Sequence, residues 1–270
     1  MISTHHAHMD RGIPETRIRT LTFDDLRISL RQGWEDFLDK RGDLVFVGFI
    51  YPIVGFFAIA VARNWALLPI IFPLVAGLTL MGPAVASGFY ELARRRERHM
   101  NASWRHFFLE FKSPAMPSIA ALTAVQFGIY VLWLAAAWAV YAATLGPVQP
   151  AAWTIFPDSL GQFLSNVFTT PEGWTMIIVG NLVGFMFAVV VLAISVVSFP
   201  MLIDRKADVP EAVRTSARVT LHNPGVILAW GFIVAFLLVL GALPFFIGLA
   251  VVLPVLGYAT WHLYTRAVER

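Results

Sequence analysis

Long apolar segments without charge are the feature that most constrains how this chain can fold. A bilayer core roughly 30 Å thick is crossed by a helix of about 20 apolar residues. Six segments without Asp, Glu, Lys or Arg approach or exceed that length. They are residues 44–62, 65–90, 117–145, 174–203, 224–241 and 244–263. The sequence therefore predicts an all-α, polytopic membrane protein with six transmembrane helices.

The composition agrees with a membrane protein and excludes several kinds of chemistry. Hydrophobic residues make up 58% of the chain and charged residues 14%, whereas a soluble domain carries roughly 25% charged residues. The chain has no Cys, which excludes disulfides, thiolate metal ligands and cysteine nucleophiles. No small-residue cleavage pattern follows the first apolar run, so we expect that run to be a retained span rather than a signal peptide.

The positive charges predict the orientation of the chain. Of the 20 Lys and Arg residues, Arg63 alone falls on one side of the membrane under this topology. Cytoplasmic loops carry an excess of such residues, so we expect a bacterial inner-membrane protein with both termini in the cytoplasm. This distribution explains the basic net charge without a nucleic-acid partner. The cluster of Arg94, Arg95, Arg96 and Arg98 is either a topology signal or a site for anionic lipids or a partner protein.

The spans divide the chain into one domain, a tail and an insertion. Residues 1–20 are polar and predicted to be disordered, and residues 21–270 form a single six-span transmembrane domain. The segment 146–173 is predicted to be an outer-face insertion. Its apolar residues recur at helical spacing and predict an amphipathic helix on the outer surface. They are Leu160, Phe163, Leu164, Val167 and Phe168.

Three polar segments, before the first, third and fifth spans, carry apolar residues at i, i+4, i+7 and i+8. The sets are Leu30, Trp34, Phe37 and Leu38; Met100, Trp104, Phe107 and Phe108; and Val213, Ala217, Thr220 and Leu221. We expect each segment to form a cytoplasmic interfacial helix, with capping signals at residues 22–25 and 208–211. Two interpretations stay open: three repeated units of interfacial helix plus hairpin, or a spacing that any amphipathic helix shows.

No residue pattern in the chain predicts chemistry. Every Asp and Glu lies in a connection or a tail, and all seven His lie on the predicted cytoplasmic side. Ionisable residues at membrane depth would mark transport paths or proton relays. The sequence also contains no nucleophile elbow, glycine-rich phosphate loop or zinc-binding His pair. We therefore expect no enzymatic activity, no catalytic residues, no cofactor and no metal ion.

Small residues predict two faces for close helix packing. Gly180 and Gly184, with Asn181 between them, form a small-xxx-small face on the fourth span. Ala84 and Gly88 form another on the second span. Each face could pack within the bundle or against a partner protein.

Three stretches of the chain carry a more specific pattern. They are LVAGLTLMGPAVASGFYELARRRER at residues 74–98, GWEDF at 33–37 and PVLGYATWHLY at 254–264. Together they resemble a domain-of-unknown-function family of six-span bacterial inner-membrane proteins, some labelled as a cytochrome c oxidase subunit. The resemblance covers nearly the whole chain and implies the fold and the location. Family members commonly have His where this chain has Tyr258, so a two-histidine site with His262 is not expected.

The residues that match this family pattern near the predicted cytoplasmic interface are the candidate polar cluster. They are Tyr90, Glu91, Arg95, Trp261 and His262. We expect Glu91 and His262 to pair across helix ends, with an arginine of the 94–96 cluster as counter-charge. The cluster is either a structural clamp or a polar site for a lipid headgroup or a small solute.

The predicted function is that of a non-enzymatic accessory, assembly or stabilising component of a membrane complex. The alternative is a carrier or channel for a small neutral or lipid-like solute, with a path lined by Gln126, Asn181 or Ser198. An enzyme that acts on lipid at the cytoplasmic face through Glu91 and His262 is a third hypothesis.

Overall fold

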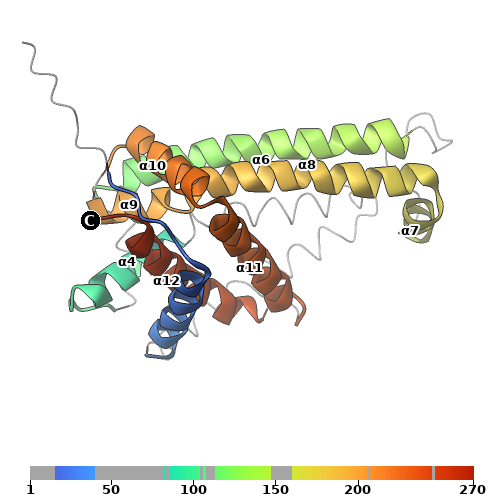
Figure 1. Ribbon diagram of the computed structural model, residues 1–270. Helices are drawn as coiled ribbons and strands as arrows, with labels where there is room; N and C mark the ends of the chain where they lie inside the picture. Colours follow the sequence, from blue (N-terminus) through green and yellow to red (C-terminus); the bar gives the residue numbers. More distant parts are fainter. Residues whose placement is uncertain are drawn as a thin grey trace, which may run out of the picture.

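The computed structural model describes residues 16–39, 82, 86–103, 106–107, 113–146, 160–205, 207–244 and 247–270. These residues form helices and one isolated β-bridge, between Ile18 and Val268. The described part of the chain is therefore all-α, as predicted. A long antiparallel hairpin of α6 (Met116–Thr144) and α8 (Pro171–Ser195) projects from a broader base (Figure 1).

The base contains most of the buried core. It is built from a helix at residues 23–39, α4 (Ser87–Glu97), α9 (Ser198–Arg205), α10 (Val209–His222) and the C-terminal half of α12 (Leu249–Ala267). Several of the largest fully buried side chains lie here, among them Trp261, Tyr264, Phe89 and Phe199. From this base α11 (Pro224–Ala242) runs obliquely away (Figure 1).

Helices begin where the sequence provides starting signals. The predicted capping box at the first helix is confirmed: Asp25 Oδ2 accepts from the Thr22 N–H at 2.8 Å, and Thr22 Oγ1 accepts from the Asp25 N–H at 3.3 Å. Thr170 caps α8 by accepting from the Gly173 N–H at 3.0 Å. Asp208 is the N-cap residue of α10, but its side chain makes no capping hydrogen bond.

Within the described part of the chain, three segments are long and apolar enough to cross a membrane: α6, the segment Pro171–Arg205 formed by α8 and α9, and α11. They correspond to the predicted third, fourth and fifth spans. The fourth is interrupted, since α8 ends at Ser195 and α9 begins at Ser198. Pro200 explains the break, because a proline has no N–H to donate to the carbonyl of Val196 and its ring crowds that carbonyl.

The other predicted spans are described only in part. The first, at 44–62, and Ala84 lie outside the described residues. The second, at 65–90, is described only near its end, where α4 continues past Tyr90 to Glu97. The helix of the sixth begins at Leu249 and extends to Ala267, later than predicted at both ends. A Cβ on Gly248 would lie 2.8 Å from the Gly241 backbone, so the preceding turn requires small residues.

The predicted apolar face of the first interfacial helix is only partly buried within the protein. Trp34 and Leu38 are exposed, whereas Gly33 and Asp36 are buried. The helix turns this way because Gly33 permits close approach to α12, where an added Cβ would meet the Ala259 N and the Val255 O at 2.7 Å. A face selected by apolarity alone misses a glycine contact and a buried carboxylate.

The remaining predicted helices and the tail have different outcomes. The third interfacial helix is present as α10, although Leu221 at its end is exposed. The second falls largely outside the described residues. The helix predicted in the insertion is present as α7 (Leu160–Thr169), and its Val167 packs with Tyr141 and Leu145 at the far end of the hairpin. Residues 16–20, predicted to be disordered, lie along the C-terminus, where the Arg19 N–H donates to the Ala267 carbonyl at 2.9 Å.

Candidate functional site

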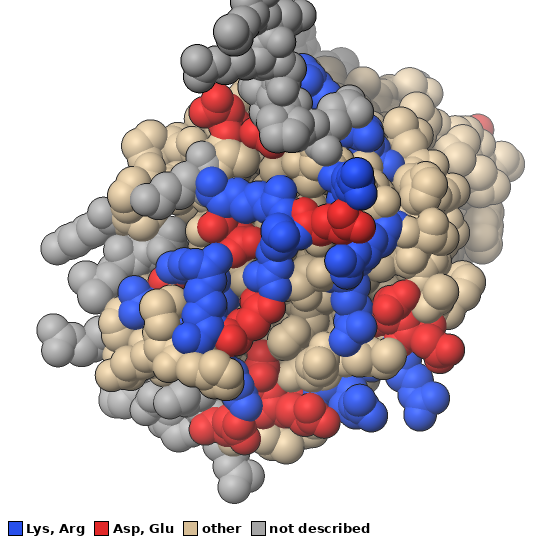
Figure 2. Space-filling model, turned by 60° about the vertical axis from the view of Figure 1, so that its left-hand side comes forward, with Lys and Arg blue, Asp and Glu red and all other residues tan. Residues whose placement is uncertain are grey.

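The two helices that carry the candidate polar cluster pack against each other. Tyr90, Glu91 and Arg95 lie on α4, and Trp261 and His262 lie on α12. The helices come close at Gly257, where an added Cβ would lie 2.7 Å from the Phe89 Cβ. Tyr90 is buried beside Thr260. The base therefore brings all five residues to one end of the molecule, on a face where basic and acidic side chains are interspersed (Figure 2).

Glu91 is held by its own helix. Its carboxylate, 3% exposed, accepts from Arg94 Nε at 2.7 Å and from Arg95 Nε at 2.6 Å. Residues three and four positions apart lie on the same helix face, so both guanidinium groups reach the carboxylate without distortion. Arg95 Nη1 also donates to the Asn101 carbonyl at 3.3 Å. The pair of arginines leaves this point of the base positively charged.

His262 has a different partner from the one predicted. Its Nε2 lies 2.8 Å from Oδ2 of Asp36, and the other Asp36 oxygen lies 3.1 Å from Arg96 Nε. The expected Glu91–His262 pair is replaced for a geometric reason. Docking of the first helix at Gly33 brings Asp36 to α12, while the arginines on α4 occupy the oxygens of Glu91.

Trp261 belongs to a third group of contacts, centred on Glu97. Its Nε1 donates to Glu97 Oε2 at 3.1 Å, and Arg270 donates to both oxygens of the same carboxylate. The Arg270 guanidinium also lies 5.8 Å above the Trp261 ring centroid. Burial by itself would raise the pKa of Glu97, but the hydrogen bond and charge of Arg270 outweigh it and lower that pKa.

Asp204 joins these groups to α9. Its side chain is 3% exposed and accepts from Arg98 Nη2 at 2.7 Å and from the Tyr264 hydroxyl at 3.0 Å. Arg270 Nη1 lies 3.6 Å from it. The result is a network of ion pairs, here called the base clamp, that connects helix 23–39, α4, α9 and α12. Buried pairs of this kind fix helix positions more than they add net stability.

Sequence reasoning missed four residues of the base clamp: Asp36, Glu97, Asp204 and Arg270. A partial signal existed for two of them. Asp36 is three positions after Gly33 and thus on the same helix face, and Asp204 directly follows the apolar run of the fourth span. Glu97 and Arg270 lie in charged segments, and only the fold identifies their partners.

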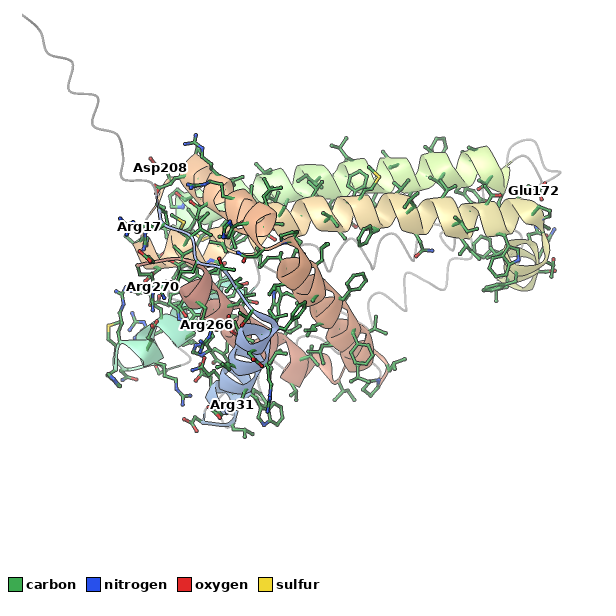
Figure 3. The ribbon with its side chains drawn as sticks, in the orientation of Figure 1. Arg17, Arg31, Glu172, Asp208, Arg266 and Arg270 are labelled. Atoms are coloured by element: carbon green, nitrogen blue, oxygen red, sulfur yellow. The ribbon has the colours of Figure 1, made fainter. Side chains whose placement is uncertain are left out.

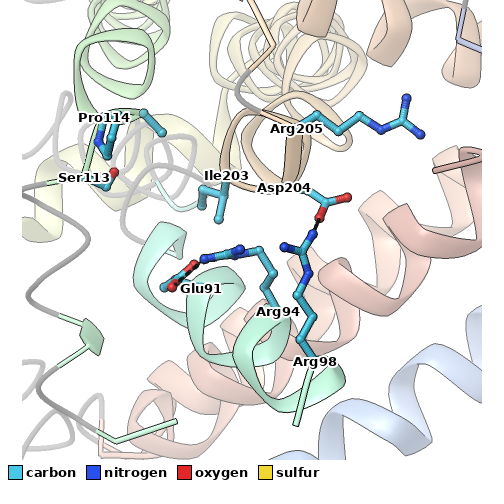
Figure 4. A pocket seen from close by; sticks show the side chains of 9 residues that line it. Glu91, Arg94, Arg98, Ser113, Pro114, Ile203, Asp204 and Arg205 are labelled. Carbon is cyan, nitrogen blue, oxygen red and sulfur yellow. Dashed lines mark hydrogen bonds and ion pairs between the residues drawn. The ribbon is translucent and has the colours of Figure 1, made fainter. Parts of the chain in front are cut away.

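Two polar pockets flank α4. The first, about 430 Å³, is lined by α4, the residues just before α6, and α9 (Figure 4). The second, about 320 Å³, lies between helix 23–39, α4 and α12 and includes Asp36 and His262 in its wall. Both volumes fall within the range of roughly 300–1,000 Å³ typical of small-molecule sites.

The predicted packing face on α8 faces α6. A Cβ on Gly184 would lie 2.8 Å from the ring of Trp133, and one on Gly180 would lie 3.9 Å from Val140. Asn181 is exposed and donates to the Ile177 carbonyl of its own helix at 2.7 Å. On the other predicted face, a Cβ on Gly88 would overlap the ring of Phe107 at 2.3 Å. The two α8 glycines therefore serve the hairpin itself.

The charged side chains are distributed unequally along the molecule. Arg17, Arg266 and Arg270 lie at the base, whereas Glu172 lies at the opposite end of the hairpin (Figure 3). Among the described residues, no group of three or more His, Asp or Glu side chains is placed to hold a metal ion. The polar chemistry of the described chain is thus concentrated at the base.

Comparison with known proteins gives one match. No curated protein and no solved structure matches the chain. The family model described as "Predicted integral membrane protein (DUF2189)" matches residues 71–204, a segment that contains α4, α6, α7, α8 and most of α9. This agrees with the candidate spans found in that segment. Over residues 71–204, just under half of its length, the chain is therefore similar to a family of predicted integral membrane proteins.

Proposed function

We propose that this protein is a non-enzymatic accessory, assembly or stabilising component of a membrane complex. The observation that carries the proposal is the base clamp, in which Asp36, Glu91, Glu97 and Asp204 each bind at least one cationic side chain. Carboxylates held in this way are poorly suited to acid–base catalysis, which needs a group able to exchange its proton with a substrate.

The base clamp also favours a static role over transport. A carrier moves one helix bundle against another around its site. Here ion pairs connect four separate helical elements at one end of the molecule, and each would have to break in such a movement. A protein whose helices are fixed together in this way can instead present a constant surface to a partner.

The proposed topology places the base in the cytoplasm of a bacterial cell, at the inner membrane. Residues 44–62, 65–90 and the first part of α12 would complete six spans, and the chain would be built from three units of interfacial helix plus hairpin. The concentration of Arg residues at the base supports this orientation. With α6, α8 and α11 crossing the membrane, α7 would lie at the outer surface.

The test is to purify the tagged full-length protein in mild detergent from its own membranes and identify what co-purifies by mass spectrometry. Stoichiometric recovery of another membrane complex supports the accessory role. A matched pair of variants locates the contact. Phe168→Gln on α7 should reduce recovery, whereas Phe23→Gln at the base, where the side chain is similarly exposed, should not. Recovery of the protein alone, or with lipid only, contradicts the proposal.

One observation favours the alternative, a channel for a small neutral solute. Gln126 on α6 is fully buried, and neither amide atom of its side chain has a hydrogen-bond partner within the described chain. A buried amide without a partner costs roughly 1–3 kcal/mol, so a function could explain its presence. The measurement is stopped-flow permeability of proteoliposomes to water and glycerol. A Gln126→Leu variant with lower permeability than wild type would favour the channel over the accessory role.

A further inference from the structure

The larger polar pocket lies where the ends of two candidate spans meet. Ser113 and Pro114 directly precede α6, which begins at Met116, and Ile203 to Arg205 end the segment formed by α8 and α9. Ends of transmembrane helices lie at the depth of lipid headgroups and their phosphates. The pocket therefore opens at the level where anionic groups are concentrated.

The wall of this pocket presents cations and hides anions. The side chains of Glu91 and Asp204 are 3% exposed, whereas those of Arg94 and Arg98 are 19% and 47% exposed. Dashed lines in Figure 4 join each carboxylate to the arginine that it binds, Glu91 to Arg94 and Asp204 to Arg98. Arg205 also lines the pocket, but its guanidinium donates to the Glu269 carbonyl and points away from Arg94 and Arg98 (Figure 4). Arg98 donates to Asp204 through Nη2, and a guanidinium carries five N–H donors, so it can bind a second anion as well.

The start of α6 adds to this positive field. No side chain caps its N-terminus, where Ala115 is the N-cap residue. The Met116 N–H donates to the Ser113 carbonyl at 3.1 Å and Pro117 has no N–H, so this end contributes the positive end of the helix dipole rather than free donors. This feature strengthens a site that the arginines and the pocket already define.

We propose that this pocket binds the phosphate group of an anionic ligand, with Arg98 as the principal donor and Arg94 beside it. A lipid headgroup and a free phosphate share this chemistry. The position at the ends of two spans makes the lipid the first candidate to test. The site does not depend on the accessory role, since a ligand could bind here whether or not a partner protein exists.

The experiment uses purified full-length protein in detergent, titrated separately with phosphatidylglycerol, phosphatidylcholine and inorganic phosphate. Binding is measured by native mass spectrometry and by the thermal unfolding midpoint. Wild type should bind phosphatidylglycerol, and Arg98→Gln should bind it about tenfold more weakly or worse, because a hydrogen bond to a charged group contributes roughly that factor. Arg31→Gln is the matched control, since it removes an exposed arginine paired with Glu35 away from the pocket.

A second variant keeps the test decisive if Arg98→Gln fails to fold. Ser113→Asp removes no described ion pair and places a negative charge in the pocket wall, so it should also weaken binding. Binding of phosphatidylglycerol alone identifies a lipid site, and competition by inorganic phosphate identifies a free phosphate. The proposal is overturned if wild type binds phosphatidylglycerol no better than phosphatidylcholine and does not bind inorganic phosphate. It is also overturned if every one of the two pocket variants that folds retains wild-type affinity.

Discussion

Substitution of Gly33 by alanine should destabilise the protein, although the same change in most helices does the opposite. Alanine stabilises a helix interior by roughly 0.8–1 kcal/mol relative to glycine. At Gly33 the added Cβ would lie 2.7 Å from two backbone atoms of α12 and 2.8 Å from the Ala259 Cβ. Backbone cannot move aside as a flexible side chain can, and overpacking of this kind costs typically about 1–3 kcal/mol. The net expectation is a loss of about 1 kcal/mol.

Gly128→Ala is a matched control, because Gly128 lies inside α6 and a Cβ added there meets nothing within 4 Å. The helix-propensity contribution is similar in both variants. The difference between their changes in unfolding free energy therefore isolates the steric cost at α12, about 1–3 kcal/mol. The assay is reversible unfolding of the purified protein in mixed micelles, followed by circular dichroism. If both substitutions change the unfolding free energy by the same amount, the close approach of helix 23–39 to α12 is refuted.

Three further predictions concern the base. Thr22→Ala removes a capping box and should lower the unfolding free energy by about 1 kcal/mol, measured by the same unfolding assay. Asp36→Asn removes the charge that binds Arg96 and His262 and should lower the unfolding free energy by about 1.5–3 kcal/mol. The rate of tryptic cleavage in helix 23–39 should rise in this variant, because the helix is held less firmly. Arg270→Gln should make stability less dependent on pH in the acidic range. The pKa of Glu97 is lowered from 4.5 in the folded protein, so its contribution is present above that value and is lost as pH falls through the lowered pKa. Thermal unfolding between about pH 5 and pH 3 should therefore show a smaller loss in the variant than in wild type, and parallel curves would contradict the pairing.

Apolar length predicted the helices of the hairpin well. The predicted span 117–145 differs from α6 by one residue at each end. Outside the hairpin, the predicted span 224–241 begins at the first residue of α11 and ends one residue before its last. Their length and hydrophobicity are local properties, and a proline at or next to the first residue marks each start. Hydropathy alone does not indicate the break after Ser195, because Pro200 lies inside an unbroken apolar run.

The partners within the polar cluster could not be predicted, for a different reason. Glu91 and His262 were predicted to lie at one end of the molecule, and both lie at the base. Which acid meets which base depends on the rotation of each helix, and a single glycine contact decided it at helix 23–39. Gly33 carries no charge or apolar side chain, so it contributes nothing to an amphipathic pattern, yet it directs Asp36 toward His262. Local periodicity cannot contain information of this kind.

Because the spans contain no charged residues, the base clamp and the phosphate pocket lie at the same end of the molecule and share Asp204. This shared residue has a measurable consequence. Asp204 accepts from Arg98 in the pocket wall and lies 3.6 Å from Arg270 in the clamp. The Arg270→Gln variant removes one arginine from beside Asp204 and leaves Arg98 in place. An anion must then compete with a carboxylate that depends more strongly on Arg98. We expect this variant to bind phosphatidylglycerol several-fold more weakly than wild type, although residue 270 does not line the pocket. Native mass spectrometry at matched lipid concentrations measures the change. Unaltered binding would mean that the clamp and the pocket act independently despite the shared carboxylate.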